Sequence, residues 1–341
     1  MKNFPKNPEH TFRMYELISG YWVACSIHVA ARLQIADLLA KGPESVAELA
    51  RKSKSHETSL YRLLRALASV GIFEELPDRI FSLNDLGATL LSDTPGSIRP
   101  WALANLGEHF PAFGNMTHGI ETGEIPFDHI YKKSMWDFYK ENPEASDNFV
   151  KAMAGVSGAV LKGIVMSYDF TPYKTIVDIG GGNGTLMFSV LNSAPASKGI
   201  IFDEAYVADD TSKQIPDDLK GRCSVAAGNF FEEIPAGADL YMTKWVIHDW
   251  NDEEAITLLK VCRKAMRKDS KLIIIDSVLP DELNKPHAGK LLDLNIFTLT
   301  PGKERTLSEY KTILNAAGLK LKRVIQTNTE ISSITECEVA D

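Results

Sequence analysis

The chain is poor in cysteine, has no excess of basic residues and contains no long apolar run. Its four cysteines are far apart and form no C-x-x-C pair, so a disulfide framework and a thiolate metal site are both unexpected. No stretch approaches the roughly 20 apolar residues of a membrane-spanning helix. The N-terminal MKNFPKNPEHTFRM also lacks the apolar centre of a signal peptide. We therefore expect a protein of the reducing cytoplasm that has no membrane partner.

The charge balance argues against nucleic acid as a partner. The sequence has 37 Lys and Arg against 45 Asp and Glu, a net charge of −8, whereas binding to phosphates needs a basic surface. With 341 residues, 44% of them hydrophobic and 24% charged, the chain is long enough for two globular domains.

Residues 1–100 predict a winged-helix domain. Apolar positions recur along 14–41, and 57–70 reads as a further helix that ends before Gly71. Two β-prone runs then flank a Pro-Asp turn in IFEELPDRIFSLN. Such a domain can bind DNA, but its candidate recognition helix offers only Arg62 and Arg65. We therefore favour a structural or dimerising role.

Residues 101–165 predict helices, and their many aromatic and Met side chains serve as core or as the wall of an apolar substrate pocket. Residues 166–341 alternate strands with helices. TIVDIG, KGIIFD, ADLYMTKW and KLIIIDSVL suit a buried parallel sheet, and LKLKRVIQTN and SSITECEV resemble an antiparallel hairpin. The pattern predicts a doubly wound, Rossmann-like α/β domain with a C-terminal hairpin.

A glycine-rich turn follows the first of these strands. Gly180, Gly182 and Gly184 give G-x-G-x-G, a turn that lets a ligand approach the backbone closely. Nicotinamide and flavin enzymes use a similar turn, but position 185 is Thr where they need a small residue. Asp178, two residues before the first glycine, would repel a pyrophosphate and attract an amino-acid ammonium group.

The second strand ends in Asp203, nineteen residues after Gly184. A carboxylate at this position can accept hydrogen bonds from both hydroxyls of a ribose. Its alternative role is to cap the loop that follows. The spacing from the glycine turn favours the ribose role.

His248 lies in KWVIHDW, just after the end of another predicted strand, and therefore at the sheet edge that carries the glycine turn. Its Trp, Val and Ile neighbours predict a neutral imidazole that can accept a proton. A purely structural histidine is the alternative. No second His or Cys stands at metal-ligand spacing, and His118 and His287 are isolated in the sequence, so no metal site is predicted.

Four motifs carry a resemblance to a known family: VDIGGGNG at 177–184, KWVIHDW at 244–250, DSVLP at 276–280 and LTPGKERT at 299–306. Over essentially its full length the chain resembles the S-adenosylmethionine-dependent O-methyltransferases of the caffeic-acid, hydroxyindole and bacterial polyketide type. The resemblance implies a seven-stranded sheet and a homodimer formed through the N-terminal domain. It also implies metal-independent methyl transfer to a hydroxyl of a small, largely apolar metabolite of secondary metabolism.

The resemblance also assigns roles to residues. His248 is the general base, and Asp276 and Glu304 flank it. Together with the residues chosen above, the cofactor-binding set is Ser157, Asp178, Gly180, Gly182, Asp203, Asn229, Phe230 and Lys244. The substrate-pocket set is Phe149, Met153, Trp245, Asp249, Asn295 and Thr298.

Three positions depart from the family pattern. Asn229 replaces an Asp, but its carbonyl can still accept a hydrogen bond from the adenine amino group. Glu204-Ala205 replaces Leu-Pro after Asp203. Asp276 replaces the longer Glu of many relatives, which makes a hydrogen bond to His248 less direct. The alternatives to methyl transfer are a diverted reaction on the same fold and cofactor, a non-catalytic winged-helix regulator, and a nicotinamide oxidoreductase.

Overall fold

The computed structural model describes residues 8–92 and 94–340. The chain forms two compact units, one from Met1–Phe110 with Asp147–Gly155 and the other from Pro111–Ser146 with Val156–Asp341. Each unit is described by itself. The predicted helical segment 101–165 therefore contributes to both units. Residues 1–7 of the stretch assessed for a signal peptide lie outside the described residues.

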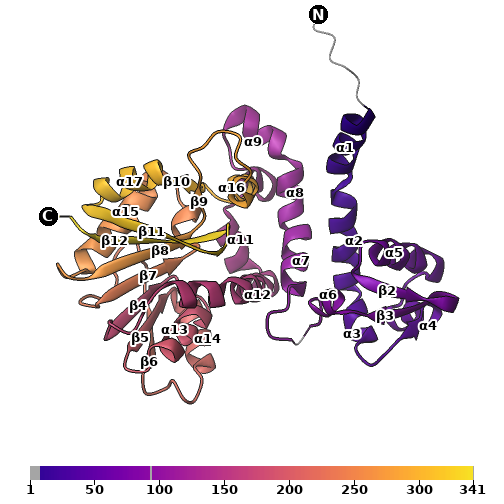
Figure 1. The fold of residues 1–341 in the computed structure, drawn as a ribbon, viewed down its shortest axis with the longest axis horizontal. Coiled ribbons are helices and arrows are strands. Elements are labelled where there is room, and N and C mark those ends of the chain that lie inside the picture. Colours follow the sequence, from indigo (N-terminus) through magenta and orange to yellow (C-terminus); the bar gives the residue numbers. More distant parts are fainter. Residues whose placement is uncertain (1–7, 93, 341) are drawn as a thin grey trace, which may run out of the picture. The chain divides into compact units, whose positions relative to one another are not determined.

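The first unit contains the predicted winged helix (Figure 1). β3 pairs antiparallel with both β2 and β1, so that Phe73 lies opposite Leu83 and Glu44 opposite Phe81. The elements are α1 (Pro8–Ser19), α2 (Tyr21–Arg32), α3 (Ile35–Leu39), β1 (Glu44–Ser45), α4 (Val46–Ser53), α5 (Glu57–Ser69), β2 (Phe73–Leu76), η1 (Pro77–Arg79), β3 (Ile80–Leu83) and α6 (Asp85–Ala88).

The turn between β2 and β3 is built by residues suited to it. Pro77 fixes its own φ, and Asp78 and Arg79 follow with φ values of 63° and 57°, a left-handed region that Asp enters more readily than most residues. Gly71, two residues after the end of α5, has φ = 82°. Glycine adopts this conformation without steric penalty, which explains why the helix ends there.

The next segment is helical, as predicted. It comprises α7 (Arg99–Leu106), α8 (His109–Gly114), α9 (Met116–Thr122), α10 (Pro126–Tyr131), α11 (Met135–Glu141) and α12 (Pro143–Ser167). Among the described residues, no single helix is long and apolar enough to cross a membrane. The bent halves of α12, Pro143–Gly158 and Val160–Ser167, meet that test only when taken together, by length and composition.

The second unit is built on a seven-stranded sheet with the order β11-β12-β8-β7-β4-β5-β6 (Figure 1). Its strands are β4 (Thr175–Ile179), β5 (Lys198–Asp203), β6 (Cys223–Ala227), β7 (Leu240–Lys244), β8 (Lys271–Asp276), β11 (Leu319–Thr329) and β12 (Ser332–Val339). Among the described strands of this sheet, β12 alone runs in the opposite direction to the others, so β11 and β12 form the predicted antiparallel C-terminal hairpin. β6 is absent from the strands predicted by pattern because CSVAA is a short and weakly apolar segment.

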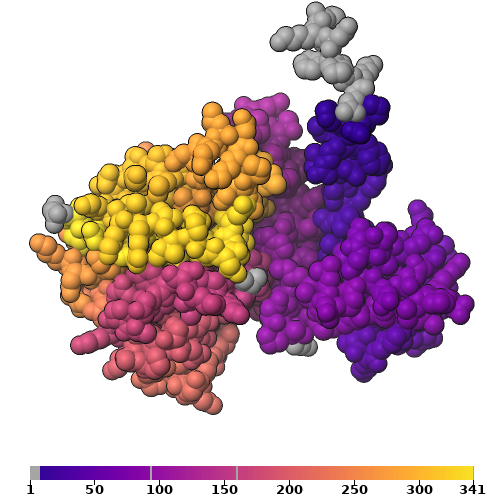
Figure 2. Space-filling view, in the orientation of Figure 1, coloured from indigo at the N-terminus to yellow at the C-terminus, as the bar shows by residue number. Residues whose placement is uncertain are grey.

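Helices cover both faces of the sheet, and strand residues alternate between the two cores. The helices that follow the strands are α13 (Thr185–Ser193), α14 (Ala205–Gln214), α15 (Asp252–Ala265), α16 (Ala288–Leu299) and α17 (Leu307–Ala316). In β8, Leu272 and Ile274 pack in the core that contains α15 and α17, whereas Ile273 and Ile275 pack in the core that contains α12 and α13. In Figure 2 the yellow surface of the C-terminal segment adjoins the pink surface around α13 and α14.

Candidate active site

The glycine turn lies at the carboxyl end of β4. Gly180, Gly182 and Gly184 have φ values of 68°, 54° and 79°, a region that only glycine enters readily. A Cβ on Gly180 would lie 2.7 Å from Val246 Cγ2, so this turn directly contacts the segment that precedes His248. The two loops therefore meet at one edge of the sheet, as their positions after parallel strands predict.

A buried polar group lies beside the turn. Asp178 is buried, and within the described part of the chain its Oδ2 has no hydrogen-bond partner. Burial raises the pKa of Asp178 to about 7, although Lys244 opposes the shift. Lys244 ends β7, and its Nζ donates to Ser157 Oγ at 2.8 Å. Burial lowers the pKa of Lys244 to about 8. The structure thus brings Asp178, Lys244 and Ser157 together, and leaves one buried acceptor free for a donor.

Asp203 ends β5 and receives two backbone hydrogen bonds. Its Oδ2 accepts from Gly182 N at 2.8 Å, and its Oδ1 accepts from Glu204 N at 2.8 Å. A carboxylate oxygen has two lone pairs, so each oxygen keeps one for another donor. Both predicted roles are therefore compatible with the geometry, because Asp203 caps the loop and can still accept from a ribose.

Asn229 lies at the turn after β6. Its Oδ1 accepts from Phe231 N at 2.9 Å, and its Nδ2 donates to Glu232 Oε1 at 3.2 Å. The carbonyl expected to bind the adenine amino group therefore already holds one donor. Phe230 is half-buried, with its ring 6.1 Å from that of Trp250 in an edge-on arrangement.

His248 is carried by η2 (Ile247–Asp249), a single 3₁₀ turn after β7. The imidazole is buried, with Nδ1 2.7 Å from Glu304 Oε1 and Nε2 3.7 Å from Asp249 Oδ1. Glu304 and His248 are 56 residues apart in sequence. Because the carboxylate accepts from Nδ1–H, the neutral imidazole keeps its free lone pair on Nε2.

The electrostatic setting of His248 differs from the sequence-based expectation. Burial lowers the pKa of His248, but the carboxylates of Glu304, Asp249 and Asp276 outweigh burial and raise it to about 10. The prediction that apolar neighbours keep the imidazole neutral is therefore wrong. The expectation considered only the Trp, Val and Ile residues next to His248 and left out the charge of these three carboxylates.

Asp276 also differs from its predicted role. Its Oδ1 accepts from Trp245 N at 2.8 Å, and its Oδ2 accepts from Tyr310 Oη at 3.0 Å. Among the described residues these are its hydrogen-bond partners, so the predicted hydrogen bond to His248 is wrong, and Asp276 acts on the imidazole through charge. The shorter side chain instead anchors Trp245, whose φ of 55° is strained for a bulky residue.

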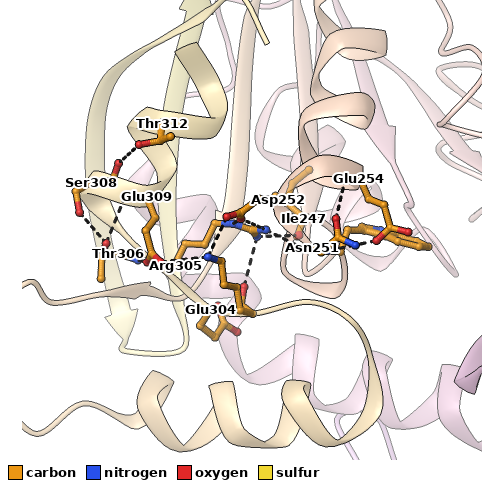
Figure 3. A network of polar contacts seen from close by, with 12 residues as sticks. Ile247, Asn251, Asp252, Glu254, Glu304, Arg305, Thr306, Ser308, Glu309 and Thr312 are labelled. Carbon is orange, nitrogen blue, oxygen red and sulfur yellow. Dashed lines mark hydrogen bonds and ion pairs between the residues drawn. The ribbon is translucent and has the colours of Figure 1, made fainter. Parts of the chain in front are cut away.

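Sequence reasoning missed two residues around this site, Tyr310 and Arg305. Tyr310 is fully buried on α17. Arg305 is also fully buried, and its guanidinium lies 2.9 Å from Asp252 Oδ1 (Figure 3). The charged run KERT predicts an exposed side chain at this position. The burial of Arg305 follows only from its contacts with residues more than 50 positions away in the sequence.

Four predicted pocket residues belong to the second unit: Trp245, Asp249, Asn295 and Thr298. Thr298 is buried on α16, where its hydroxyl donates to the Asn295 carbonyl at 2.8 Å. The same helix carries Asp293, whose Oδ1 accepts from Glu304 N at 2.8 Å. α16 is therefore joined directly to the segment that holds the base.

The remaining two pocket residues, Phe149 and Met153, belong to the first unit. The ring of Phe149 lies edge-on to His109 with centroids 5.9 Å apart. The side chains of Phe149 and Met153 are both half-buried. Their approach to His248 stays a prediction.

His118 is not isolated in space. Its Nε2 lies 2.8 Å from Glu124 Oε2, and its ring stacks on that of His129 with centroids 3.7 Å apart. The three ligand atoms lie within 4.8 Å of one another, close enough to hold a metal ion. The hydrogen bond and the stack account for this arrangement with protein groups alone.

Comparisons with known proteins agree with this architecture. Residues 113–320 match an O-methyltransferase domain, and residues 15–93 match an O-methyltransferase dimerisation domain. The phenazine O-methyltransferase of Lysobacter antibioticus is 40% identical over 322 residues, which cover 94% of each chain. The mitomycin biosynthesis 6-O-methyltransferase of Streptomyces lavendulae is 36% identical over 336 residues, covering 94% of this chain and 93% of the relative.

Two solved structures show the same fold over nearly the whole chain. LaPhzM has a TM-score of 0.93 at 39% identity and covers 96% of this chain and 99% of its own. NcsB1, an O-methyltransferase of neocarzinostatin biosynthesis in complex with S-adenosylhomocysteine and 1,4-dihydroxy-2-naphthoic acid, has a TM-score of 0.79 at 31% identity, with 93% and 95% covered. The chain therefore belongs to the O-methyltransferase family, as an enzyme that takes its methyl group from S-adenosylmethionine.

Proposed function

We propose that the enzyme methylates a hydroxyl of a small, largely apolar phenolic or polyketide-like metabolite, with His248 as the general base. The observation that carries the proposal is the 2.7 Å contact between His248 Nδ1 and Glu304 Oε1. It lies in a loop that touches the glycine turn. Two similar proteins support an aromatic acceptor, since one is named a phenazine O-methyltransferase and the NcsB1 structure holds 1,4-dihydroxy-2-naphthoic acid.

The residues at the strand ends fit S-adenosylmethionine. The unpartnered Oδ2 of Asp178 suits the ammonium of its methionine part, and Asp203 keeps a lone pair on each oxygen for the ribose hydroxyls. A Cβ on Gly182 would meet no atom within 4 Å, so the backbone is open to a ligand there. Gly180, Ser157 and Lys244 complete the binding of the methionine part, while Asn229 and Phe230 bind the adenine. When bound, the cofactor supplies an electrophilic methyl group on a sulfonium.

His248 then manages one proton. Nε2 accepts the proton of the acceptor hydroxyl, while Glu304 holds the opposite nitrogen and stabilises the imidazolium. A phenol has a pKa of about 10, close to that of His248 in this site. Only the neutral form of His248 can take this proton, and the carboxylates that raise its pKa make that form a stronger base than an ordinary imidazole.

The N-terminal unit supports a homodimer. The O-methyltransferase dimerisation domain spans 15–93. α1, all of which is described, buries none of its residues, and its apolar side chains Phe12, Leu17 and Ile18 are more than half exposed. A second copy of the chain is the occupant that this domain match favours. All four cysteines are free, in keeping with a reducing cytoplasm.

Isotopic methyl transfer tests the proposal. The enzyme is mixed with methyl-labelled S-adenosylmethionine and a panel of phenolics and polyketides, and products are read by mass spectrometry. We expect transfer to a hydroxyl, and a loss of about 10²–10⁴-fold in His248→Gln with S-adenosylhomocysteine binding retained in calorimetry. Near-wild-type turnover in this variant would remove the base role. Cofactor binding without methylation of any hydroxyl would favour a diverted reaction.

A further inference from the structure

The segment Thr300–Arg305 contacts the backbone of η2 as well as the His248 ring. Arg305 Nη1 donates to the Ile247 carbonyl at 3.1 Å, and its Nη2 donates to the Trp250 carbonyl at 2.8 Å. One guanidinium therefore holds the carbonyls on both sides of His248, and Figure 3 shows Arg305 between Ile247 and Asp252. Asp252 neutralises its charge from the first turn of α15.

Gly302 makes the closest approach of this segment. A Cβ at this position would lie 1.8 Å from the His248 carbonyl oxygen and 2.4 Å from the Asp249 carbonyl carbon. Any side chain here would push the two backbones apart. Gly302 N donates to Thr300 Oγ1 at 3.2 Å, which fixes the position of the glycine.

The turn needs such support because it is weak by itself. η2 is one 3₁₀ turn of three residues, and isolated 3₁₀ turns have poor hydrogen-bond geometry. It follows Trp245 in a left-handed conformation, and such strain persists only where the surroundings impose it. A fully buried arginine that donates to two carbonyls supplies that constraint.

We propose that Gly302–Arg305 forms a brace in which Arg305 sets the backbone of His248 while Glu304 sets its ring. Arg305 is then a positioning residue for proton transfer, although it touches neither acceptor nor cofactor. This inference rests on the proposed function of His248. The brace implies that the orientation of His248 depends on the two hydrogen bonds that the planar guanidinium donates, and not on its positive charge alone.

Arg305→Lys separates the effect of the two guanidinium hydrogen bonds from the effect of the positive charge. Lysine keeps the cation beside Asp252 but is a point donor that lacks the planar fork. We expect kcat to fall about 10–100-fold, with the KM of the acceptor and the S-adenosylhomocysteine Kd within about twofold of wild type. The pH limb of kcat/KM should also move, because the His248–Glu304 contact changes.

Arg267→Lys is a control at an exposed arginine with similar contacts. Arg267 likewise donates to a backbone carbonyl, that of Gly237, and pairs with Asp239, but it lies near the amino end of β7, away from His248. We expect unchanged kcat and an unchanged pH limb in this variant. Equal kcat in Arg305→Lys and wild type would overturn the brace. So would equal losses in both variants, because a general stability effect would then explain them.

A second readout separates this inference from the proposed function. Imidazole ¹⁵N signals of the full-length enzyme report the His248 ring directly, and His248→Gln identifies them. We expect Arg305→Lys to shift these signals and Arg267→Lys to leave them in place. If wild type methylates no acceptor, the proposed function fails while the ring signals still decide on the brace. Should Arg305→Lys not fold, Asp252→Asn removes the counter-charge from a half-exposed position, and unshifted ring signals there would contradict the brace.

Discussion

Glu304 lies 2.7 Å from His248 through one carboxylate oxygen, while its other oxygen is buried without a hydrogen-bond partner among the described residues. All of the hydrogen bonding of this side chain is therefore directed at the base. Burial raises the pKa of Glu304, and His248 opposes the shift. The pair is best regarded as a coupled unit that shares its protons.

Glu304→Gln should move the acidic limb of kcat/KM to lower pH. Burial lowers the pKa of His248, and Glu304 is the first of the carboxylates that raise it above its ordinary value, so removing that charge lowers it. The free base then exists at lower pH, although kcat falls because the imidazolium loses its counter-charge. Steady-state rates over about pH 6–10 measure the limb. Exposed Glu253→Gln is the control, and a limb that moves upward would contradict the prediction.

Asp178→Asn should stabilise the cofactor-free enzyme and weaken cofactor binding. Folding raises the pKa of Asp178 from 3.8 to about 7. The free energy of unfolding of the wild-type protein therefore falls as the pH rises through this window, because Asp178 must ionise while buried. We expect a higher Tm than wild type at about pH 8, and equal values at about pH 4. Calorimetry should show weaker S-adenosylhomocysteine binding. A lower Tm at the higher pH would refute the linkage.

Asn229→Asp should tighten cofactor binding about fivefold, since hydrogen bonds to an ionised acceptor are roughly twice as strong as neutral ones. The present Oδ1 already accepts from Phe231 N, and Asp offers a second oxygen to the adenine amino group. Titration with S-adenosylhomocysteine measures the Kd. Asn229→Ala should weaken binding, and an Asp variant as weak as Ala would exclude this position from adenine recognition.

Tyr310→Phe should lower the free energy of unfolding by about 1–3 kcal/mol, because Asp276 Oδ2 is left buried without its donor. The same change loosens the anchor of Trp245, so turnover should fall as well. Urea denaturation followed by fluorescence gives the stability. Tyr206→Phe, at a half-exposed tyrosine, is the control and should be neutral. Equal stability of both variants would show that the buried bond contributes nothing.

Leu17→Glu combined with Ile18→Glu should convert the homodimer to a monomer. Both side chains are exposed on α1, which buries none of its described residues, so charge there should leave each chain folded. Light scattering after size-exclusion chromatography gives the mass, and circular dichroism checks the fold. Leu283→Glu, at another exposed leucine, should stay dimeric. A dimer that survives the double substitution would place the interface elsewhere.

Much of the fold follows from local pattern. The apolar runs of β4 and β8 predict buried strands, and Gly71 predicts the end of α5, which the structure places at Ser69. β6 escapes prediction because its pairing with β5, and not its own composition, makes it a strand.

From the residue pattern alone the site is predictable only where its chemistry lies within one motif, and the position of Glu304 beside His248 followed from the family resemblance. The glycines and His248 each lie within one motif. The pKa of His248 is not predictable in this way, because burial lowers it and Glu304, 56 residues away in the sequence, raises it. The partners of Asp276 likewise depend on Tyr310, which lies 34 positions further on. Long-range contacts decide protonation and orientation, and periodicity carries no information about them.

The short parallel pair β9 (Val278–Leu279) and β10 (Arg305–Thr306) places Arg305 beside Val278, two residues after Asp276. This pair ties the segment that carries Glu304 and Arg305 to the chain just beyond the end of β8. A substitution that shifts this end of β8 would therefore move Asp276 and Glu304 together. Selection on proton transfer is thus expected to constrain two segments that are almost 30 positions apart as though they were one.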